Sequence, residues 1–160
     1  MTHSTDARMR RLVAPFILAL TLIFSASIAS AAEPSQSSTE ANTVKIRLTI
    51  NGQSTTATLD DNPTARDFLS MLPLTLTLED YASTEKITYP PRRLSTQGAP
   101  AGIDPEVSDI TYYAPWGNLA LFYKDFGYSA GLIRLGRFDS GVEALSVRGS
   151  LKVTIEAIGQ

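Results

Sequence analysis

Cysteine is absent from the 160-residue sequence, and histidine occurs once, as His3. Without cysteine the chain has no disulfide and no thiol nucleophile. Zinc sites rely on cysteine and histidine ligands, and serine hydrolases need a histidine base, so a chain that loses His3 has neither. The sequence also has no glycine-rich phosphate loop, Walker sequence or dinucleotide fingerprint. We therefore predict no metal and no cofactor.

The first 32 residues have the layout of a secretory signal peptide. Three arginines precede an apolar run over residues 12–28, and Ala29-Ser30-Ala31 has the A-x-A form that signal peptidase reads. The alternative is a retained membrane anchor, but Pro15 and several hydroxyl residues interrupt a run shorter than the ~20 apolar residues of a comfortable span. We predict cleavage after Ala31 or Ala32 and an exported protein, periplasmic or secreted, with no membrane association afterwards.

Cleavage at this point changes the chemistry available to the chain. It removes His3, Asp6 and three arginines, which leaves 11 basic and 15 acidic residues. A net charge of about −4 argues against nucleic acid as a partner, because phosphates demand a basic surface. Residues 33–42 (EPSQSSTEAN) are small and polar, and they predict a flexible linker before a domain over residues 43–160.

The start of that domain has readable local signals. Apolar and polar residues alternate over 44–50, Asn51-Gly52 favours a type I′ turn, and residues 55–59 return as a second strand. Asn62 before Pro63 marks the start of a short helix that ends at Pro73. We interpret the preceding Asp60 and Asp61 as capping residues.

The rest of the domain reads as short strands separated by turns. Gly136 marks a bulge or a close approach, residues 92–105 form a long turn-rich loop, and residues 139–144 hold one helical turn. The strand patterns cover residues 74–78, 87–89, 110–113, 118–123, 132–138 and 151–155. About eight short strands with one or two short helices predict a mainly β fold, a closed antiparallel β-barrel.

Aromatic residues are concentrated in one segment. Residues 112–128 hold seven of the eleven aromatic residues that remain after cleavage. On alternating strands some of these rings face outward, and aromatic rings with a polar edge suit an extended peptide or a small molecule as partner. The alternative is that the rings belong to the core or cover a barrel mouth. We predict a ligand-binding groove lined by Trp116, Tyr113, Tyr123 and Phe126.

Two neighbouring arginines, Arg92 and Arg93, are candidates for the rim of this groove. A guanidinium offers fixed donors to a carbonyl or carboxylate, although paired arginines on loops are also common as solvated charge. Arg134 and Arg137 are expected to face solvent. The carboxylates are scattered along the sequence, and no pair can be assigned to catalysis, so the catalytic residues stay unknown.

Four blocks of the sequence form a recognisable pattern: residues 62–69 (NPTARDFL), 89–94 (YPPRRL), 111–123 (TYYAPWGNLALFY) and 131–137 (GLIRLGR). Together they resemble a family of small bacterial and archaeal cyclophilin-like proteins of unestablished function. The resemblance implies the cyclophilin barrel, in agreement with the strand and helix pattern.

The resemblance does not bring an activity with it. True cyclophilins are peptidyl-prolyl isomerases with a Phe-His-Arg strand motif, and residues 85–93 have no such triplet. Their arginine polarises the prolyl amide, and Arg92 or Arg93 would have to replace it. We therefore expect a module that binds a peptide or small ligand. The alternatives are a divergent periplasmic prolyl isomerase, or a small-molecule enzyme that uses Asp, Glu or Tyr groups.

Overall fold

A computed structural model describes residues 43–159 of the chain, so the predicted signal peptide and linker lie outside the described residues. The predicted hairpin is confirmed: β1 (Val44–Ile50) and β2 (Gln53–Leu59) pair antiparallel from end to end. At its turn Asn51 and Gly52 have φ of 46° and 86°. Both values lie in the left-handed region that a type I′ turn requires.

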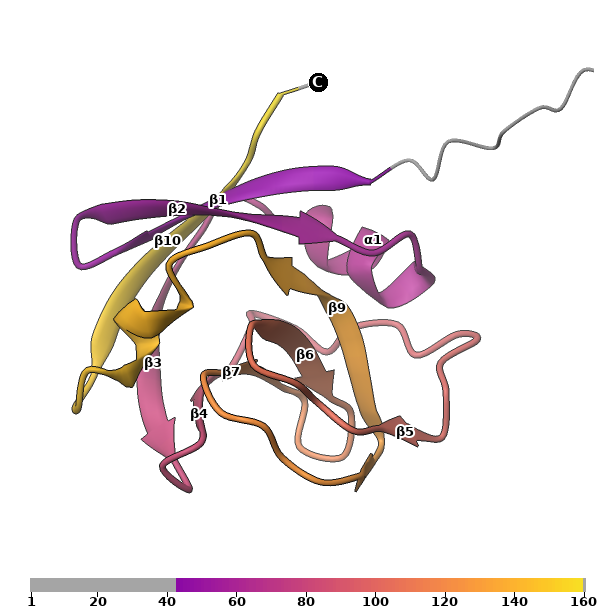
Figure 1. Ribbon diagram of the computed structural model, residues 1–160. Helices are drawn as coiled ribbons and strands as arrows, with labels where there is room; N and C mark the ends of the chain where they lie inside the picture. The colour runs from indigo at the N-terminus through magenta and orange to yellow at the C-terminus, as the bar shows by residue number, and fades with distance from the viewer. Residues whose placement is uncertain (1–42, 160) are drawn as a thin grey trace, which may run out of the picture. The chain divides into compact units, whose positions relative to one another are not determined.

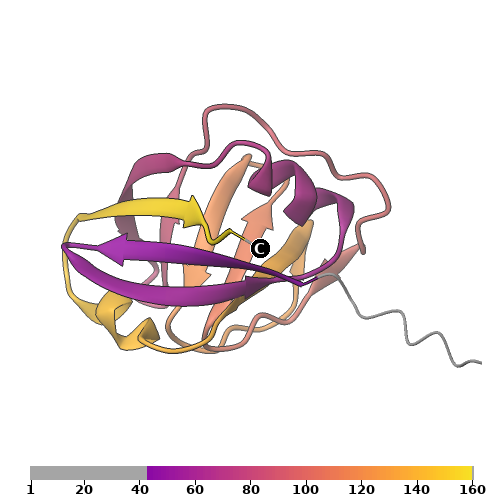
Figure 2. The same cartoon turned by 90° about the horizontal axis from the view of Figure 1, so that it is seen from above.

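Eight strands close into one antiparallel barrel, which confirms the predicted fold class (Figure 1). In order around the barrel they are β1, β10, β3, β4, β7, β6, β9 and β2. The six strands after the hairpin are β3 (Leu74–Tyr81), β4 (Glu85–Thr88), β6 (Asp109–Tyr113), β7 (Asn118–Phe122), β9 (Leu132–Phe138) and β10 (Leu151–Ala157). Seen from above, β1, β2 and β10 lie in front of the remaining strands, with the α-helix that follows β2 to one side (Figure 2). Closure leaves the barrel with no unpaired edge strand.

The one α-helix within residues 43–159, α1 (Pro63–Leu69), begins where the sequence predicts. The side-chain oxygen of Asn62 accepts a hydrogen bond from the Ala65 backbone N–H at 2.8 Å, and Phe68 is fully buried in the core. The prediction that Asp60 and Asp61 cap the helix is wrong. Their carboxylates instead form ion pairs with Arg134 and Arg66, respectively. The cap is therefore neutral, and the two acids serve to anchor neighbouring basic side chains.

Two short elements differ from the sequence-based prediction, the helical turn after β9 and the strand predicted over residues 87–89. The helical turn expected over residues 139–144 is a 3-10 helix, η1 (Val142–Ser146), a few residues later. In β4 the inward side chains are Lys86 and Thr88, while Tyr89 lies beyond the strand and is exposed. Lys86 is tolerated inside the barrel because its ammonium donates to Asp80 Oδ1 at 2.5 Å and to two backbone carbonyls.

Gly136 occupies the close approach that the sequence predicts. A Cβ at this position would lie 2.3 Å from the carbonyl oxygen of Thr58 on β2. The pairing of β9 with β6 also shifts register beside it, because Ile110 pairs with Gly136 and Thr111 pairs with Arg134. The glycine thus lets β9 bend at a bulge while it stays hydrogen-bonded to β2.

Part of the barrel is buried on both of its faces. The main core fills the interior, and a second apolar cluster of Ala120, Phe122 and Leu132 lies on the outer face of β7 and β9. Ile103, from a small ribbon of β5 (Gly102–Ile103) and β8 (Ser129–Ala130), packs against this outer cluster. Every residue of β7 is buried as a result. The outer cluster forms the floor on which the candidate site is built.

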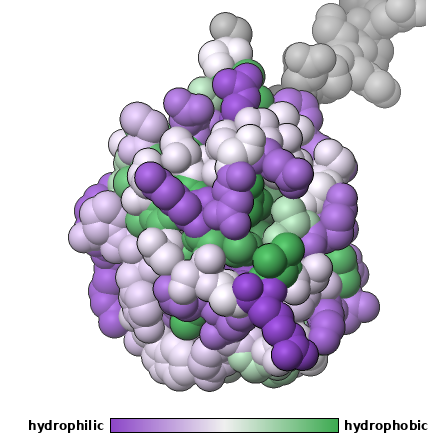
Figure 3. All heavy atoms as spheres, turned by 90° about the vertical axis from the view of Figure 1, so that its left-hand side faces the viewer, coloured by the Kyte–Doolittle hydropathy of each residue, from purple (hydrophilic) through white to green (hydrophobic). Residues whose placement is uncertain are grey.

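The surface elsewhere is mixed. The side of the barrel at the left of Figure 1 shows a band of apolar atoms crossed and bordered by polar side chains (Figure 3). Neither of the two helical segments in the described part of the chain has the length and apolarity to cross a membrane.

Candidate functional site

A pocket of about 180 Å³ opens on the outer face of the barrel, between the β3–β4 turn, the β6–β7 turn and the segment that follows β7. Its lining residues are Tyr81, Ala82, Thr84, Glu85, Tyr113, Trp116, Asn118, Ala120, Phe122, Phe126, Ser129 and Leu132. The pocket therefore combines an apolar floor with aromatic walls and four other polar side chains, those of Thr84, Glu85, Asn118 and Ser129.

The walls of the pocket are aromatic rings held at steep angles to one another. The Trp116 ring lies 5.6 Å from that of Tyr81 and 5.4 Å from that of Tyr113, at 84° and 79°. On the other side, the rings of Phe122 and Phe126 lie 6.4 Å apart and are tilted by 32°. The two edge-to-face pairs of Trp116 stabilise each other and leave ring faces available to a ligand. Trp116 and Phe126 remain 49% and 50% exposed, so the pocket is open to solvent.

The turn that carries Trp116 is held in place from behind. It closes with a hydrogen bond from the Gly117 backbone N–H to the Tyr113 carbonyl at 2.8 Å, and Gly117 has a φ of 80°. The Arg93 guanidinium donates to the carbonyl oxygens of Ala114 and Pro115 at 2.8 and 3.3 Å. Arg93 is thus a positioning residue for the tryptophan, because it fixes the loop on which the ring is mounted.

Glu85 is the only acidic residue that lines the pocket. It begins β4, where it pairs with Tyr81 on β3 and Phe122 on β7, and its side chain is half-buried. Desolvation raises the pKa of Glu85 from an ordinary 4.5 to about 7. Within residues 43–159 no hydrogen bond or ion pair of this carboxylate is formed.

Two further polar groups of the lining lack a partner. The Asn118 side chain is 2% exposed, and its amide nitrogen donates to the Leu119 carbonyl at 3.0 Å while its oxygen accepts nothing from the described residues. The Thr84 hydroxyl is likewise buried without a hydrogen bond in the described part of the chain. Buried polar atoms are normally satisfied, so two orphans beside one pocket require an explanation.

The edge of the pocket formed by the β3–β4 turn has an unusual backbone. Ala82 and Ser83 both have positive φ, 49° and 57°, although neither is glycine. The turn closes with the Thr84 N–H donating to the Tyr81 carbonyl at 3.2 Å, and the Thr84 carbonyl accepts from Tyr123 and Lys124. Residues with side chains rarely adopt this region, so the turn holds its conformation at a cost.

Of the six predicted ligand-binding residues, Tyr113, Trp116 and Phe126 line the pocket, whereas Tyr123, Arg92 and Arg93 do not. Tyr123 packs half-buried against the main core, and the Lys124 ammonium lies 6.0 Å from the centre of its ring. Ligand binding by any of the six stays a prediction.

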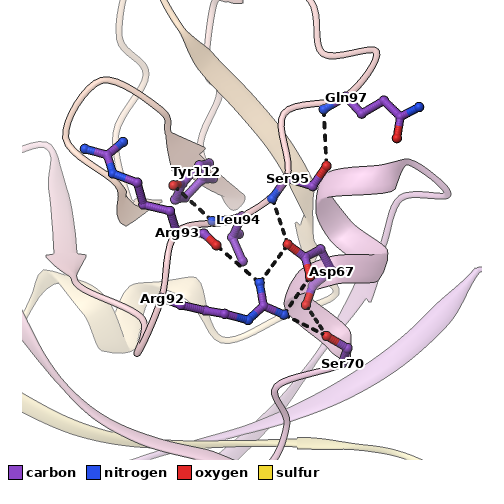
Figure 4. A network of polar contacts seen from close by, with 8 residues as sticks. All are labelled: Asp67, Ser70, Arg92, Arg93, Leu94, Ser95, Gln97 and Tyr112. Carbon is purple, nitrogen blue, oxygen red and sulfur yellow. Dashed lines mark hydrogen bonds and ion pairs between the residues drawn. The ribbon is translucent and has the colours of Figure 1, made fainter.

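Arg92 belongs to a separate polar network that ties the long loop to α1 (Figure 4). Its guanidinium makes a two-pronged ion pair with Asp67, at 2.9 and 2.7 Å, and the Ser95 N–H donates to the same carboxylate at 2.7 Å. These contacts, that from Arg92 first and that from Ser95 second, lower the pKa of Asp67 to about 2. Figure 4 shows the Arg92 and Arg93 side chains leaving the loop in different directions.

The sequence reasoning missed Tyr81, Thr84, Glu85 and Asn118. One signal was available, since Asn118 opens an otherwise apolar strand (NLALF) that is buried throughout. The other three share the β3–β4 hairpin, whose position against β7 is not visible in the local sequence. The described residues contain no group of three or more potential metal ligands. The chemistry of the lining is thus that of hydrogen-bond acceptors between aromatic rings.

Comparison with known proteins adds a family and a fold. The model of a protein family described as the Cyclophilin-like family matches residues 48–156. The solution structure of a hypothetical protein from Archaeoglobus fulgidus is similar, with a TM-score of 0.54 and 17% sequence identity. The similarity covers 76% of this chain and 99% of the archaeal one, and at this identity it shows the fold alone. No curated protein matches the chain.

Proposed function

Since the chain belongs to the Cyclophilin-like family, we propose that it uses the barrel of that family as a binding module, with the pocket beside Trp116 as its ligand site. The observation that carries the proposal is the aromatic pocket itself. Its Trp116 and Phe126 rings are half-exposed, its floor is apolar, and the Thr84 hydroxyl and the Asn118 side-chain oxygen have no hydrogen-bond partner within residues 43–159. Small-ligand sites have this composition, with a mainly apolar lining and a few placed polar groups.

The alternative, a prolyl isomerase, has weaker support. That reaction needs a hydrogen-bond donor to polarise the prolyl amide, and no arginine lines the pocket. Arg92 and Arg93 are instead bound to Asp67 and to the turn carbonyls. Glu85, Thr84 and Asn118 offer mainly acceptors, which do not stabilise a carbonyl oxygen.

Binding at the pocket can be followed through Trp116, the only tryptophan of the chain. We expect ligands from a set of blocked peptides and small molecules to change its fluorescence and to shift the NMR signals of Trp116 and Phe126. Trp116→Ala should abolish binding. Tyr89→Ala, which removes an exposed ring that does not line the pocket, should leave binding intact. Binding at another place on the protein, or binding that is unchanged in Trp116→Ala, would contradict the proposal.

A protease-coupled assay on a proline tetrapeptide separates the two functions. We expect no catalysis above background. Catalysis that is lost in Arg92→Ala and Arg93→Ala would instead establish the isomerase.

We also propose that the protein is exported. The proposal is supported by the arginines, the apolar run and the Ala-Ser-Ala site of the first 32 residues. N-terminal sequencing of the protein recovered after expression of the full chain in a bacterium should begin at Ala32 or Glu33. A protein that still begins at Met1 would contradict the proposal.

A further inference from the structure

We propose that the pocket selects a cation that carries N–H groups, a primary ammonium or a guanidinium, with Glu85 as its counter-ion. This inference rests on the proposed function and names the ligand class of the same site. Three features carry it: the arrangement of the rings, the unpaired carboxylate and the two orphan acceptors.

The aromatic walls of the pocket suit a cation. The Trp116 ring stands nearly perpendicular to the rings of Tyr81 and Tyr113, and all three line the pocket. A cation over a ring face is attracted by the negative face of the π-system, most strongly for tryptophan. Aromatic walls of this kind are therefore suited to ammonium groups. A neutral apolar ligand lacks this electrostatic attraction to the rings.

The lining carries one acidic side chain and no basic one. Glu85 lies among Tyr81, Phe122 and other apolar groups, and no lysine or arginine lines the pocket. An ionised carboxylate there has lost water and gained no partner from the described residues. A bound cation would supply the missing counter-charge, and a pair formed in a partly dry site is stronger than one in water. An anionic ligand would meet repulsion instead.

The two orphan acceptors distinguish one kind of cation from another. The Asn118 oxygen is a pure acceptor, and the Thr84 hydroxyl can accept as well. Both residues line the same pocket as Glu85. Thr84 precedes Glu85 in the chain, and Asn118 lies at the other end of β7 from Phe122, the strand partner of Glu85. A primary ammonium or a guanidinium donates several hydrogen bonds, whereas a tetraalkylammonium donates none. The lining therefore favours the N–H cation over the quaternary one.

The size of the pocket sets the size of the ligand group. Its volume of about 180 Å³ is close to that of an engineered cavity of about 150 Å³ that binds benzene. It therefore takes one side-chain-sized group. A lysine or arginine side chain of a peptide and a small free amine share this chemistry, and the experiment has to separate them.

The experiment titrates the full chain at pH 8, where Glu85 is ionised, with four small probes of similar size. These are n-butylammonium, methylguanidinium, tetramethylammonium and neutral 1-butanol, followed by Trp116 fluorescence and NMR shifts. We expect the two N–H cations to bind at least tenfold more tightly than 1-butanol and severalfold more tightly than tetramethylammonium. A blocked Gly-Lys-Gly peptide, compared with its norleucine analogue, tests the peptide source against the free amine.

Matched variants assign the effect to the pocket. Glu85→Gln keeps the shape and removes the charge, and it should weaken n-butylammonium binding at least tenfold. Glu143→Gln removes the same charge from an exposed position on η1 outside the pocket, and it should change nothing. Thr84→Val should narrow the difference between n-butylammonium and tetramethylammonium.

The outcomes separate the two proposals. Equal binding of cations and 1-butanol, or unchanged cation binding in Glu85→Gln, overturns the charge selectivity. If neutral peptides bind at Trp116 and the cations do not, the proposal of a ligand site in the pocket is kept and the proposal that it selects a cation is rejected. If no ligand shifts the pocket signals, both proposals fail. The probe comparison on the unmodified chain decides the question even where a variant does not fold.

Discussion

Asp67 and Glu85 are both carboxylates on the barrel surface, and the protein treats them in opposite ways. Asp67 accepts two hydrogen bonds from Arg92 and one from the Ser95 backbone, and the pKa of Asp67 falls to about 2. Glu85 has no such partner within the described residues, and burial raises the pKa of Glu85 to about 7.

The difference separates a carboxylate that is paired within the chain from one that is left without a partner within the described residues. A carboxylate whose oxygens accept hydrogen bonds from the chain stabilises the fold. The Asp67 network does so by joining α1 to the long loop. A desolvated carboxylate without a partner destabilises the fold when it ionises. Such costs are characteristic of functional sites, where the missing partner arrives from outside.

The largest expected effect that tests this contrast is the pH dependence of stability. The folded pKa of Glu85, about 7, is higher than its ordinary value of 4.5, so the folded state holds the proton more tightly. Its contribution is full below pH 4.5 and is lost as the pH rises through 7. At ~1.4 kcal/mol per pKa unit the full shift would correspond to about 3 kcal/mol, but the side chain is only half-buried and solvent screens the effect, so we expect a loss of about 2 kcal/mol. Urea unfolding at pH 4.5 and 8 should show this fall, and Glu85→Gln should remove it.

Asp67→Asn should lower the free energy of unfolding at pH 7 by about 1–2 kcal/mol, because hydrogen bonds to a charged group are lost or weakened. The folded pKa of Asp67 is depressed, so its contribution is present above pH 3.8 and disappears as the pH falls through about 2. Urea unfolding at pH 7 measures the effect. A variant as stable as the original would show that the network does not hold the loop to α1.

Thr84→Val should raise the free energy of unfolding by about 1 kcal/mol, since valine keeps the shape and removes a buried hydroxyl without a partner. Thermal unfolding can measure the gain. Increased stability together with weaker cation binding would identify Thr84 as a group kept for a ligand. A loss of stability would show that the hydroxyl already has a structural role.

The smallest effect concerns the strained β3–β4 turn. Ala82→Gly should raise the free energy of unfolding by about 0.5 kcal/mol. The steric cost of an alanine at positive φ, which glycine avoids, is larger than the entropy that glycine loses on folding. Ala101→Gly is the matched control at an exposed alanine without positive φ, and it should be destabilising. Urea unfolding of the two variants should show changes in the free energy of unfolding of opposite sign if the turn is strained.

Much of the barrel follows from local sequence. Asn51-Gly52 predicts the hairpin turn, Asn62-Pro63 predicts the helix start, and alternation of apolar residues predicts most strands. β4 shows the limit of that reasoning. Ile87 and Tyr89 indicate the strand, but the inward position goes to Lys86, because Asp80 and two carbonyls near residue 148 satisfy its ammonium. These partners come from other parts of the chain.

The candidate site was less predictable for the same reason. Trp116, Tyr113 and Phe126 lie close together in the sequence, so their concentration is visible there. The desolvation of Glu85 depends on rings from β3, β7 and the β6–β7 turn, which only the closed barrel brings together. The placement of Arg92 and Arg93 likewise depends on distant acceptors.

The contact of Arg93 with the turn carbonyls has a consequence for the entropy of binding. Because the guanidinium holds the Ala114 and Pro115 carbonyls, the wall that carries Trp116 is ordered before a ligand arrives. A ligand that meets an ordered wall loses its own freedom of motion but does not have to arrest that of a loop. Substitutions on the opposite wall can then change what the pocket accepts while the tryptophan stays where it is.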